Sequence, residues 1–246
     1  MTVKLMQKLF VDYAFEDKII LDEEQSRHIA KSLRMKKGDM VTVCDGAGTD
    51  YGCIIDEITK DSVTLSVCYK QASSSEPSIK VSLYQGVPKG DKMEDIIQKC
   101  VELGIYEITP VLTKRSISRP DEKQAKKKQI RYSKIALEAA QQSGRGIVPE
   151  IKEMTSFKNA VESCEADLII LFYEGGGKAL KSLINDDIKT VAVFIGPEGG
   201  FEKEEVDAVT RKGGINATLG KRILRTQTAP VAALSAIMLL TGNLES

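Results

Sequence analysis

The chain has 246 residues, of which 42% are hydrophobic and 28% are charged, so it is long enough for one large domain or two modest ones. Its 35 basic and 35 acidic residues give a formal net charge of +0, which excludes an argument for nucleic-acid binding from overall charge and leaves only local basic patches. We find no signal peptide, and the longest apolar run, Ala229 to Leu240, is too short to span a bilayer. We therefore expect a cytoplasmic protein with no membrane segment.

The histidine and cysteine content argues against a metal centre. The chain has one histidine, His28, and five cysteines that form no CxxC pair, so we expect no metal. Reduced thiols are the simplest interpretation of an odd number of cysteines in a cytosolic protein. A Ser-His-Asp triad would have to use His28, which lies in a predicted helix, so we interpret this histidine as structural.

Residues 1–69 are typical of a small β domain. A helix is expected from Asp22 to about Leu33, with Asp22 as its N-cap. The turn at Lys60-Asp61 separates two predicted strands and favours a hairpin. Short strands with one helix indicate a small closed β-barrel. The strands are expected at Lys8 to Val11, Lys18 to Leu21, Met40 to Asp45, Tyr51 to Ile58 and Ser62 to Tyr69.

A basic turn leads from the predicted helix into the next strand. Its cations, Arg34, Lys36 and Lys37, could contact phosphate, although a solvated turn is the better interpretation of this pattern taken alone. Further along, Gln71 to Ser78 is small and polar with one proline, which is typical of a linker. We place the domain boundary there, with a first domain at residues 1–72 and a second at 73–246.

Strands alternate with helices after this linker. Asp91 is expected to cap a helix whose apolar stripe runs from Met93 to Leu103, and a further helix continues through Glu138 to Arg145. This alternation favours an α/β fold with a mostly parallel sheet that is covered on both faces. The strands are expected at Ile79 to Tyr84, Ile105 to Leu112, Asp167 to Tyr173 and Val191 to Ile195.

Two glycine-containing loops near the C-terminus predict a ligand pocket. The first, Gly196 to Phe201, follows a buried strand, and the second, Gly220 to Thr226, follows a short strand at Asn216 to Leu219. Glycines at the carboxyl end of a strand let the backbone approach a ligand, and open α/β sheets bind ligands at that edge. The final helix, from Thr228, is apolar on nearly all sides, so we expect it to be buried in a core or in a subunit interface.

Taken alone, these loops indicate a nucleoside-like cofactor and nothing more specific. They match neither the P-loop nor the GxGxxG pattern, and a tight turn without a ligand is the alternative. Arg222 and Arg225 lie in the second loop, where the apolar Ile223 and Leu224 suit walls around an adenine ring better than a cradle for phosphate. Three predicted strands end in glycine-containing segments, at Glu174, Gly196 and Gly220.

Two segments, GPEGGF (Gly196 to Phe201) and LGKRILRTQTAP (Leu219 to Pro230), resemble the C-terminal signatures of the 16S ribosomal RNA uridine-N3 methyltransferases, the RsmE family of the SPOUT superfamily. The resemblance covers nearly the whole chain in the family's order. One departure is Gln227, where the family usually has a glutamate, so a mechanism that uses this carboxylate as the base does not transfer to the chain. The other matching segments are RHIAKSLRMKKGD (Arg27 to Asp39), KGDKMEDIIQKCVELG (Lys89 to Gly104), TKRS (Thr113 to Ser116) and EAAQQSGR (Glu138 to Arg145).

The resemblance implies an N-terminal PUA-like β-barrel that helps to hold RNA and a C-terminal SPOUT-type α/β knot, in which a parallel sheet carries a deep trefoil knot. It also implies a homodimer, with S-adenosyl-L-methionine bent in the knot and the active site at the subunit boundary. The implied reaction transfers the cofactor's methyl group to N3 of a uridine in the 16S rRNA of the small ribosomal subunit. Because this transfer is a one-step displacement, alignment of the reacting atoms should supply much of the rate acceleration.

The resemblance further suggests roles for individual residues. Arg225 and Arg145 are the expected cations that stabilise the developing uridine anion, and Glu138 or Glu198 is the expected proton acceptor. The run Lys126 to Lys128 either contacts RNA or forms a solvated helix face. The cofactor is expected among Leu171, Phe172, Gly196, Gly199, Gly200, Leu219, Gly220, Leu224 and Thr226. RNA phosphates are expected at Arg34, Lys36, Lys37, Arg115, Arg119 and Arg145.

Two other classes of function remain open at this stage. The first is a non-catalytic RNA-binding protein whose α/β domain senses S-adenosylmethionine, and Gln227 is the feature that favours it. The second is a small-molecule α/β enzyme that uses a nucleotide, against which the basic segments and the separate N-terminal barrel argue. Methyl transfer to RNA distinguishes the methyltransferase from both.

Overall fold

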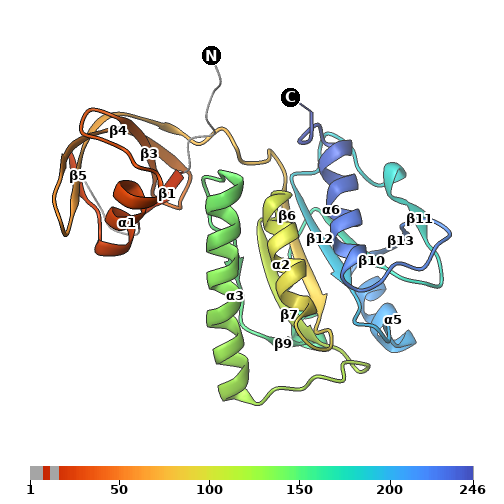
Figure 1. The fold of residues 1–246 in the computed structure, drawn as a ribbon. Coiled ribbons are helices and arrows are strands. Elements are labelled where there is room, and N and C mark those ends of the chain that lie inside the picture. The colour runs from red at the N-terminus through yellow and green to blue at the C-terminus, as the bar shows by residue number, and fades with distance from the viewer. Residues whose placement is uncertain (1–7, 12–16, 246) are drawn as a thin grey trace. The chain divides into compact units, whose positions relative to one another are not determined.

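The computed structural model describes residues 8–11 and 17–245, which form two compact units (Figure 1). The first unit contains the described residues up to Glu76 together with Ala140–Val148, and the second contains Pro77–Ala139 and the described residues from Pro149 onward. The chain therefore enters the first unit twice. The sequence predicts a second domain at residues 73–246, but Ala140–Val148 lies in the first unit. The residues that this segment contacts there are distant in sequence, so a local pattern did not indicate them.

The first unit is built on a five-stranded sheet in the order β1-β3-β4-β5-β2. All its strand pairs are antiparallel except β1 with β3, and β4 and β5 form the predicted hairpin. Ile19, Ile55 and Leu65 are fully buried on its inner face. The strands are β1 (Lys8–Phe10), β2 (Lys18–Ile20), β3 (Met40–Cys44), β4 (Thr49–Ile58) and β5 (Val63–Ala72).

The helix of this unit begins as the sequence predicts. Asp22 is the N-cap of α1 (Glu23–Arg27), and its Oδ1 accepts a hydrogen bond of 2.7 Å from the backbone N–H of Gln25. A π-helical turn, η1 (His28–Ser32), continues the helix and ends before Arg34, whose φ of 54° places it in the left-handed region. This conformation costs a non-glycine residue energy, so the basic turn is held in shape by its surroundings.

Glu76 fastens the segment Ala140–Val148 into the first unit. Its Oε1 accepts from the backbone N–H groups of Gly146 at 2.8 Å and Ile147 at 3.1 Å, while its Oε2 lies 2.5 Å from Nη2 of Arg145. The Arg145 side chain is 4% exposed, and a buried charge of this kind requires such a partner. This segment is therefore an integral part of the first unit.

An eight-stranded, all-parallel sheet forms the second unit, in the order β11-β13-β10-β12-β6-β7-β8 with β9 also paired to β7. Every residue of β12 except Thr190 is buried, as expected for a parallel strand covered on both faces. The strands are β6 (Lys80–Gly86), β7 (Glu107–Leu112), β8 (Glu150–Ile151), β9 (Thr155–Ser156), β10 (Leu168–Phe172), β11 (Lys178–Ala179), β12 (Thr190–Ile195) and β13 (Ile215–Thr218).

The helices of this unit cover the sheet in two groups. Helix α2 packs on α6, which also contacts β6, while α4 packs on α5 and both contact strands of the sheet. Asp91 precedes α2 as predicted, but its side chain makes no capping hydrogen bond, so that part of the prediction is wrong. The elements are α2 (Lys92–Glu102), α3 (Glu122–Ser143), α4 (Phe157–Ser163), η2 (Leu180–Ser182), α5 (Lys203–Arg211) and α6 (Thr228–Leu240). The residues of α3 from Ala140 onward belong to the first unit.

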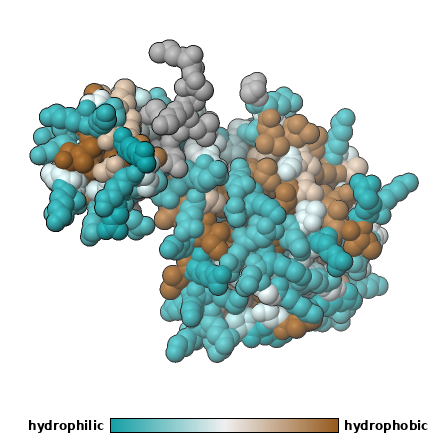
Figure 2. All heavy atoms as spheres, in the orientation of Figure 1, coloured by the Kyte–Doolittle hydropathy of each residue, from teal (hydrophilic) through white to brown (hydrophobic). Residues whose placement is uncertain are grey.

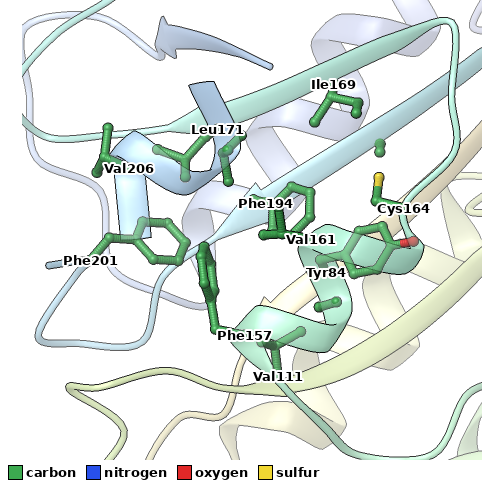
Figure 3. Close-up of a cluster of buried hydrophobic side chains, with 13 residues drawn as sticks. Tyr84, Val111, Phe157, Val161, Cys164, Ile169, Leu171, Phe194, Phe201 and Val206 are labelled. Carbon is green, nitrogen blue, oxygen red and sulfur yellow. The ribbon is translucent and has the colours of Figure 1, made fainter. Parts of the chain in front are cut away.

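An aromatic cluster joins the sheet to α4 and to the chain before α5 (Figure 3). The rings of Tyr84 and Phe194 stack with centroids 4.5 Å apart, and Phe157 packs edge-on against Phe194 at 5.9 Å. The ring centroid of Phe201, the last residue of the first glycine loop, lies 5.5 Å from that of Phe157. Aromatic pairs in such geometries add to the gain from burial, so this cluster anchors the end of the loop firmly.

Helix α6 is less completely buried than the sequence suggests. Ala233, Leu234 and Ile237 are buried, whereas Leu239 is 55% and Leu240 is 39% exposed. Hydrophobic side chains gather over the region of α6 in the view of Figure 2. The expectation of burial on all sides within the chain's own core is therefore wrong, and a subunit interface remains the open alternative. Within the described residues, no helix is long and apolar enough to cross a membrane.

The cysteines of the structure are all free, and none forms a disulfide. Burial raises the pKa of the Cys44 and Cys53 thiols to about 11 and that of Cys100 to about 12. These buried groups are therefore neutral thiols at physiological pH. In the part of the chain that the structure describes, no group of three or more His, Cys, Asp or Glu side chains could hold a metal ion.

Candidate active site

A pocket of about 440 Å³ opens at the carboxyl ends of β13, β10 and β12, three neighbouring strands of the parallel sheet. Its position is the one at which open α/β sheets bind ligands, and its size is in the range of small-molecule sites. The chain that follows each of these strands supplies the walls. The lining residues are Phe172 to Glu174, Ile195 to Glu198, Gly200, Phe201, Ala217 to Thr226 and Ala229.

The first glycine loop, Gly196 to Phe201, folds back tightly on itself. The backbone N–H of Gly200 donates to the carbonyl of Pro197 at 2.9 Å, and Gly200 has a φ of 68°. A Cβ atom at Gly196 would lie 3.0 Å from the Cα of Gly200, closer than real Cβ contacts allow without a shift. A side chain at this position would therefore have to displace the backbone of Gly200 by a few tenths of an ångström.

The second loop, Leu219 to Thr226, runs from β13 to the start of α6. Gly220 has a φ of 105° and donates its N–H to Oγ1 of Thr218 at 3.1 Å. At the other end, the carbonyl of Arg225 accepts from the backbone N–H groups of Thr228 at 2.8 Å and Ala229 at 2.9 Å. Between these ends the loop is open to solvent, and Ile223 is 85% exposed.

A hydrogen-bonded group behind the pocket connects the two loops. Oγ1 of Thr226 donates to the carbonyl of Gly196 at 2.9 Å and accepts from Nε2 of Gln85 at 3.2 Å. Nε2 of Gln85 also lies 3.0 Å from the carbonyl of Gly86. Our sequence reasoning missed Gln85, although an amide at the carboxyl end of an apolar strand is a feature that could have identified it.

Cations line the rim on the side of the second loop. The side chains of Lys221, Arg222 and Arg225 are exposed, and across the described ranges 8–11 and 17–245 none of them has an ion-pair partner. Arg115, near the first loop, differs: its Nε lies 2.9 Å from Oε1 of Glu202, and its Nη1 donates to the carbonyl of Gly199 at 2.7 Å. Of these cations, the ones available to a ligand are therefore the three of the second loop.

Of the two predicted proton acceptors, Glu198 lines the pocket and Glu138 does not. Oε1 of Glu198 lies 2.5 Å from Nζ of Lys92 and 3.2 Å from the backbone N–H of Lys89. Partial burial acts to raise the pKa of Glu198, but the hydrogen bonds from Lys92 and the backbone outweigh it and hold the pKa below its ordinary value of 4.5. A carboxylate held in this way is a weak base. Glu138 is exposed on α3, where its Oε1 lies 3.8 Å from Nζ of Lys134.

Most of the predicted cofactor residues line the pocket, and two do not. Phe172, Gly196, Gly200, Leu219, Gly220, Leu224 and Thr226 are all in its wall. Leu171 is fully buried and belongs to the aromatic cluster, because alternate residues of a strand face opposite sides of the sheet. A Cβ at Gly199 would lie 3.0 Å from the Cβ of Arg115, so this glycine faces that arginine.

The predicted RNA-binding cations fall into exposed and engaged groups. Lys36 and Lys37 are exposed in the basic turn, beside Arg34. Nη2 of Arg119 donates to the carbonyl oxygens of Thr113 at 2.9 Å and Lys114 at 3.2 Å, which holds its side chain along the backbone. Arg145 lies in the first unit with Glu76, as described above, and Arg115 is held by Glu202 and Gly199.

Gln227 directly follows the pocket residue Thr226 and occupies the N-cap position of α6 without a capping hydrogen bond. Its Oε1 is buried and, among the residues that the structure describes, has no hydrogen-bond partner. An unpaired buried acceptor carries a desolvation cost, and a charged carboxylate in the same surroundings would carry a larger one.

The protein combines a small β domain with an all-parallel α/β domain. The α/β domain has a pocket with glycine loops at the carboxyl edge of its sheet, which is a site of the type that binds nucleosides. Two family models match the chain: an RNA methyltransferase domain at residues 75–238 and an RNA methyltransferase PUA domain at residues 21–68. Ribosomal RNA small subunit methyltransferase E from Bacillus subtilis is 38% identical over 222 residues, with 87% of each chain covered. The chain belongs to this family, the RsmE methyltransferases.

Solved structures agree with this assignment. A ribosomal RNA small subunit methyltransferase E from Neisseria gonorrhoeae, bound to S-adenosyl methionine, matches with a TM-score of 0.86 and 27% identity over 96% of this chain and 98% of that one. A methyltransferase from Legionella pneumophila, in complex with the cofactor SAM, matches with a TM-score of 0.84 and 28% identity over 95% and 97% of the two chains. The predicted fold class, an α/β methyltransferase domain with a small PUA-like domain, is confirmed.

Proposed function

We propose that the protein uses S-adenosyl-L-methionine to methylate N3 of uridine 1498 in the 16S rRNA of the small ribosomal subunit. Membership of the RsmE family is the observation that carries this proposal, because the match extends over both domains and most of each relative. The SAM-bound structures of similar proteins support the choice of cofactor.

The pocket of this chain fits such a cofactor. Ile195, Leu219 and Leu224 offer apolar walls for an adenine ring, and the glycine loops bring backbone donors and acceptors to its edge. Lys221 and Arg222, the other free cations of the second loop, suit the carboxylate of the cofactor's methionine part. When bound, the cofactor supplies a methyl group on a positively charged sulfur, which is the electrophile of the reaction.

Arg225 is the residue to which we assign stabilisation of the uridine anion. Its guanidinium lines the pocket and has no competing ion pair in the described chain, so it is available to an oxygen that gains negative charge. Glu198, with its lowered pKa, is better suited to orienting Lys92 and the loop than to accepting the N3 proton. The assignments of Glu138 as base and of Arg145 as a second cation rest on the family resemblance.

We further propose a cytoplasmic homodimer with the trefoil knot of the SPOUT superfamily. The exposed Leu239 and Leu240 on α6 are apolar surface of the kind that a second copy would cover. We propose that the basic turn with Arg34, Lys36 and Lys37 contacts RNA phosphates. Arg115 and Arg119 would contact RNA as well, once RNA replaces the hydrogen-bond partners that they have in this structure. Salt dependence of RNA binding would test these contacts.

The experiment is methyl transfer from labelled S-adenosylmethionine to small ribosomal subunits that lack the modification, followed by mass spectrometry of the product nucleoside. We expect N3-methyluridine. Cofactor binding without transfer to the subunit or to free 16S rRNA would favour the second candidate, a non-catalytic RNA-binding protein, which the neutral Gln227 supports.

A further inference from the structure

Gln85 stands at the carboxyl end of β6, directly behind the pocket, and is completely buried. Its Nε2 lies 3.0 Å from the carbonyl of Gly86, 3.2 Å from Oγ1 of Thr226 and 3.5 Å from the carbonyl of Gly196. All three partners are hydrogen-bond acceptors at these contacts. The –NH₂ group must therefore face them, since the amide oxygen in its place would repel three oxygens.

The hydrogen bonds of Gln85 form a relay across the two loops. Gln85 donates to the Thr226 hydroxyl, which donates its single proton to the carbonyl of Gly196 at 2.9 Å. The Thr226 hydroxyl is thus committed to the relay and has no proton left to donate to a ligand. Hydrogen bonds that follow one another in a buried setting strengthen each other, so the relay acts as a unit.

The strand that carries Gln85, β6, also packs closely against the first loop. A Cβ at Gly86 would lie 2.6 Å from the backbone nitrogen of Pro197, so only glycine permits this approach. The end of β6, the first loop and Thr226 are thereby held at fixed distances from one another. Oε1 of Gln85 is buried and has no partner within the described residues, so its burial carries a desolvation cost that the hydrogen bonds of Nε2 offset.

We infer that Gln85 is a positioning residue that sets the distance between the two glycine loops and so pre-forms the cofactor pocket. The inference rests on the proposed S-adenosylmethionine function and extends it to a residue outside the pocket wall. A pocket with its loops already in place loses less conformational entropy when the ligand binds. Breaking the relay should therefore lower the affinity for the cofactor.

The test compares Gln85→Leu and Thr226→Val, which break the relay from its two ends, with Gln129→Leu. Gln129 is a matched control: its Nε2 donates to the carbonyl of Ile151 at 3.0 Å, far along the sheet from the pocket. We expect each relay variant to bind S-adenosylmethionine about tenfold more weakly by calorimetry, a change of about 1.4 kcal/mol. The double variant should be no weaker than the weaker single variant, because the relay is one unit. Gln129→Leu should keep the wild-type affinity.

A second readout uses the protein without cofactor. Hydrogen–deuterium exchange should speed up in residues 196–201 and 219–226 together in either relay variant, and should stay unchanged there in Gln129→Leu. Thr226→Ser, which keeps the hydroxyl, should retain more affinity than Thr226→Val. If Gln85→Leu does not fold, the isosteric Thr226→Val still tests the relay.

The outcomes separate the two proposals. Unchanged affinity in both relay variants, or weaker affinity with unchanged loop exchange, would overturn the positioning role and leave the proposed function intact. A wild-type protein that does not bind S-adenosylmethionine would overturn the proposed function and this inference with it.

Discussion

The two loops that enclose the pocket are held in different ways. The first, Gly196 to Phe201, is fastened along its length by Arg115, by the pairing of Glu198 with Lys92 and by the buried ring of Phe201. Hydrogen bonds hold the second, Leu219 to Thr226, at its two ends in the described structure. The first loop thus forms a fixed wall, and the second forms a wall that carries the free charges. Electrostatic catalysis needs charges that are not already paired, so this division suits the proposed reaction.

The strongest way to break the fixed wall is Gly196→Val. Its new Cβ would lie 3.0 Å from the Cα and 3.1 Å from the carbonyl carbon of Gly200, backbone atoms that cannot rotate away. We expect S-adenosylmethionine affinity to fall about 100-fold or more, measured by calorimetry. Gly199→Ala is the milder comparison in the same loop, because its Cβ would have one close contact, the Cβ of Arg115 at 3.0 Å, and no backbone atom nearer than 3.6 Å. Binding by Gly196→Val within about threefold of wild type would contradict the tight-turn interpretation.

Arg225→Ala tests the charged wall. Methyl transfer should fall about 100-fold or more while cofactor affinity changes by less than about threefold, because the guanidinium acts mainly on the uridine anion. Arg115→Ala should show the opposite pattern, with weaker cofactor binding and kcat retained at saturating cofactor, because Arg115 holds the carbonyl of Gly199. Single-turnover assays with calorimetry distinguish the two patterns. Loss of cofactor binding in Arg225→Ala would place Arg225 in the cofactor site instead.

Gly220→Ala probes the second loop with a smaller change. Gly220 has a φ of 105°, and a Cβ there would meet no atom within 4 Å, so the cost is backbone strain alone. We expect the free energy of unfolding to fall by roughly 1–2 kcal/mol, measured by urea titration. If Gly196→Val, measured by the same urea titration, lost no more free energy of unfolding than Gly220→Ala, the two loops would be equally constrained.

The smallest expected effect is the change in stability as Glu198 becomes protonated at low pH. Its pKa is lower in the folded chain than the ordinary 4.5, so the ionised carboxylate stabilises the fold above that value, and this contribution is lost as pH falls through the folded pKa. The ion pair with Lys92 is partly exposed, so Glu198→Gln should cost less than about 1 kcal/mol at pH 6. The difference from wild type should shrink on acidification below the ordinary pKa. Thermal unfolding across this pH range measures it, and a growing difference would be the contrary result.

Periodicity and turn residues predicted much of the fold in both units. The apolar run of β12, the glycine loops and the cap at Asp22 depend on neighbouring residues, so local sequence is enough to place them. Helix α4 (Phe157–Ser163) and the two-residue strands β8 and β9 were absent from the predictions, because segments so short carry little periodic pattern.

The side chains of the pocket were predictable in part. Motif resemblance placed Thr226 and Gly196, yet it did not distinguish Gly200, which lines the pocket, from Gly199, which faces Arg115. Gln85 was missed because its partners in the two loops, Gly196 and Thr226, are 111 and 141 residues away in the chain. Contacts over such separations arise from the order of strands in the sheet, which no local pattern encodes.

Because Ala140–Val148 belongs to the first unit, the two units cannot be separated by a single cut in the chain. The chain passes between the units three times, after Glu76, after Ala139 and after Val148, so neither unit corresponds to one continuous stretch of the gene. A fragment that began at residue 73 would keep Glu76 and Arg145 but would lose the strand residues that surround this segment, such as Cys44, whose Sγ donates to the carbonyl of Gly146 at 3.1 Å. Division of the gene at the linker would therefore not yield two self-contained parts, because each fragment would lack residues of the first unit.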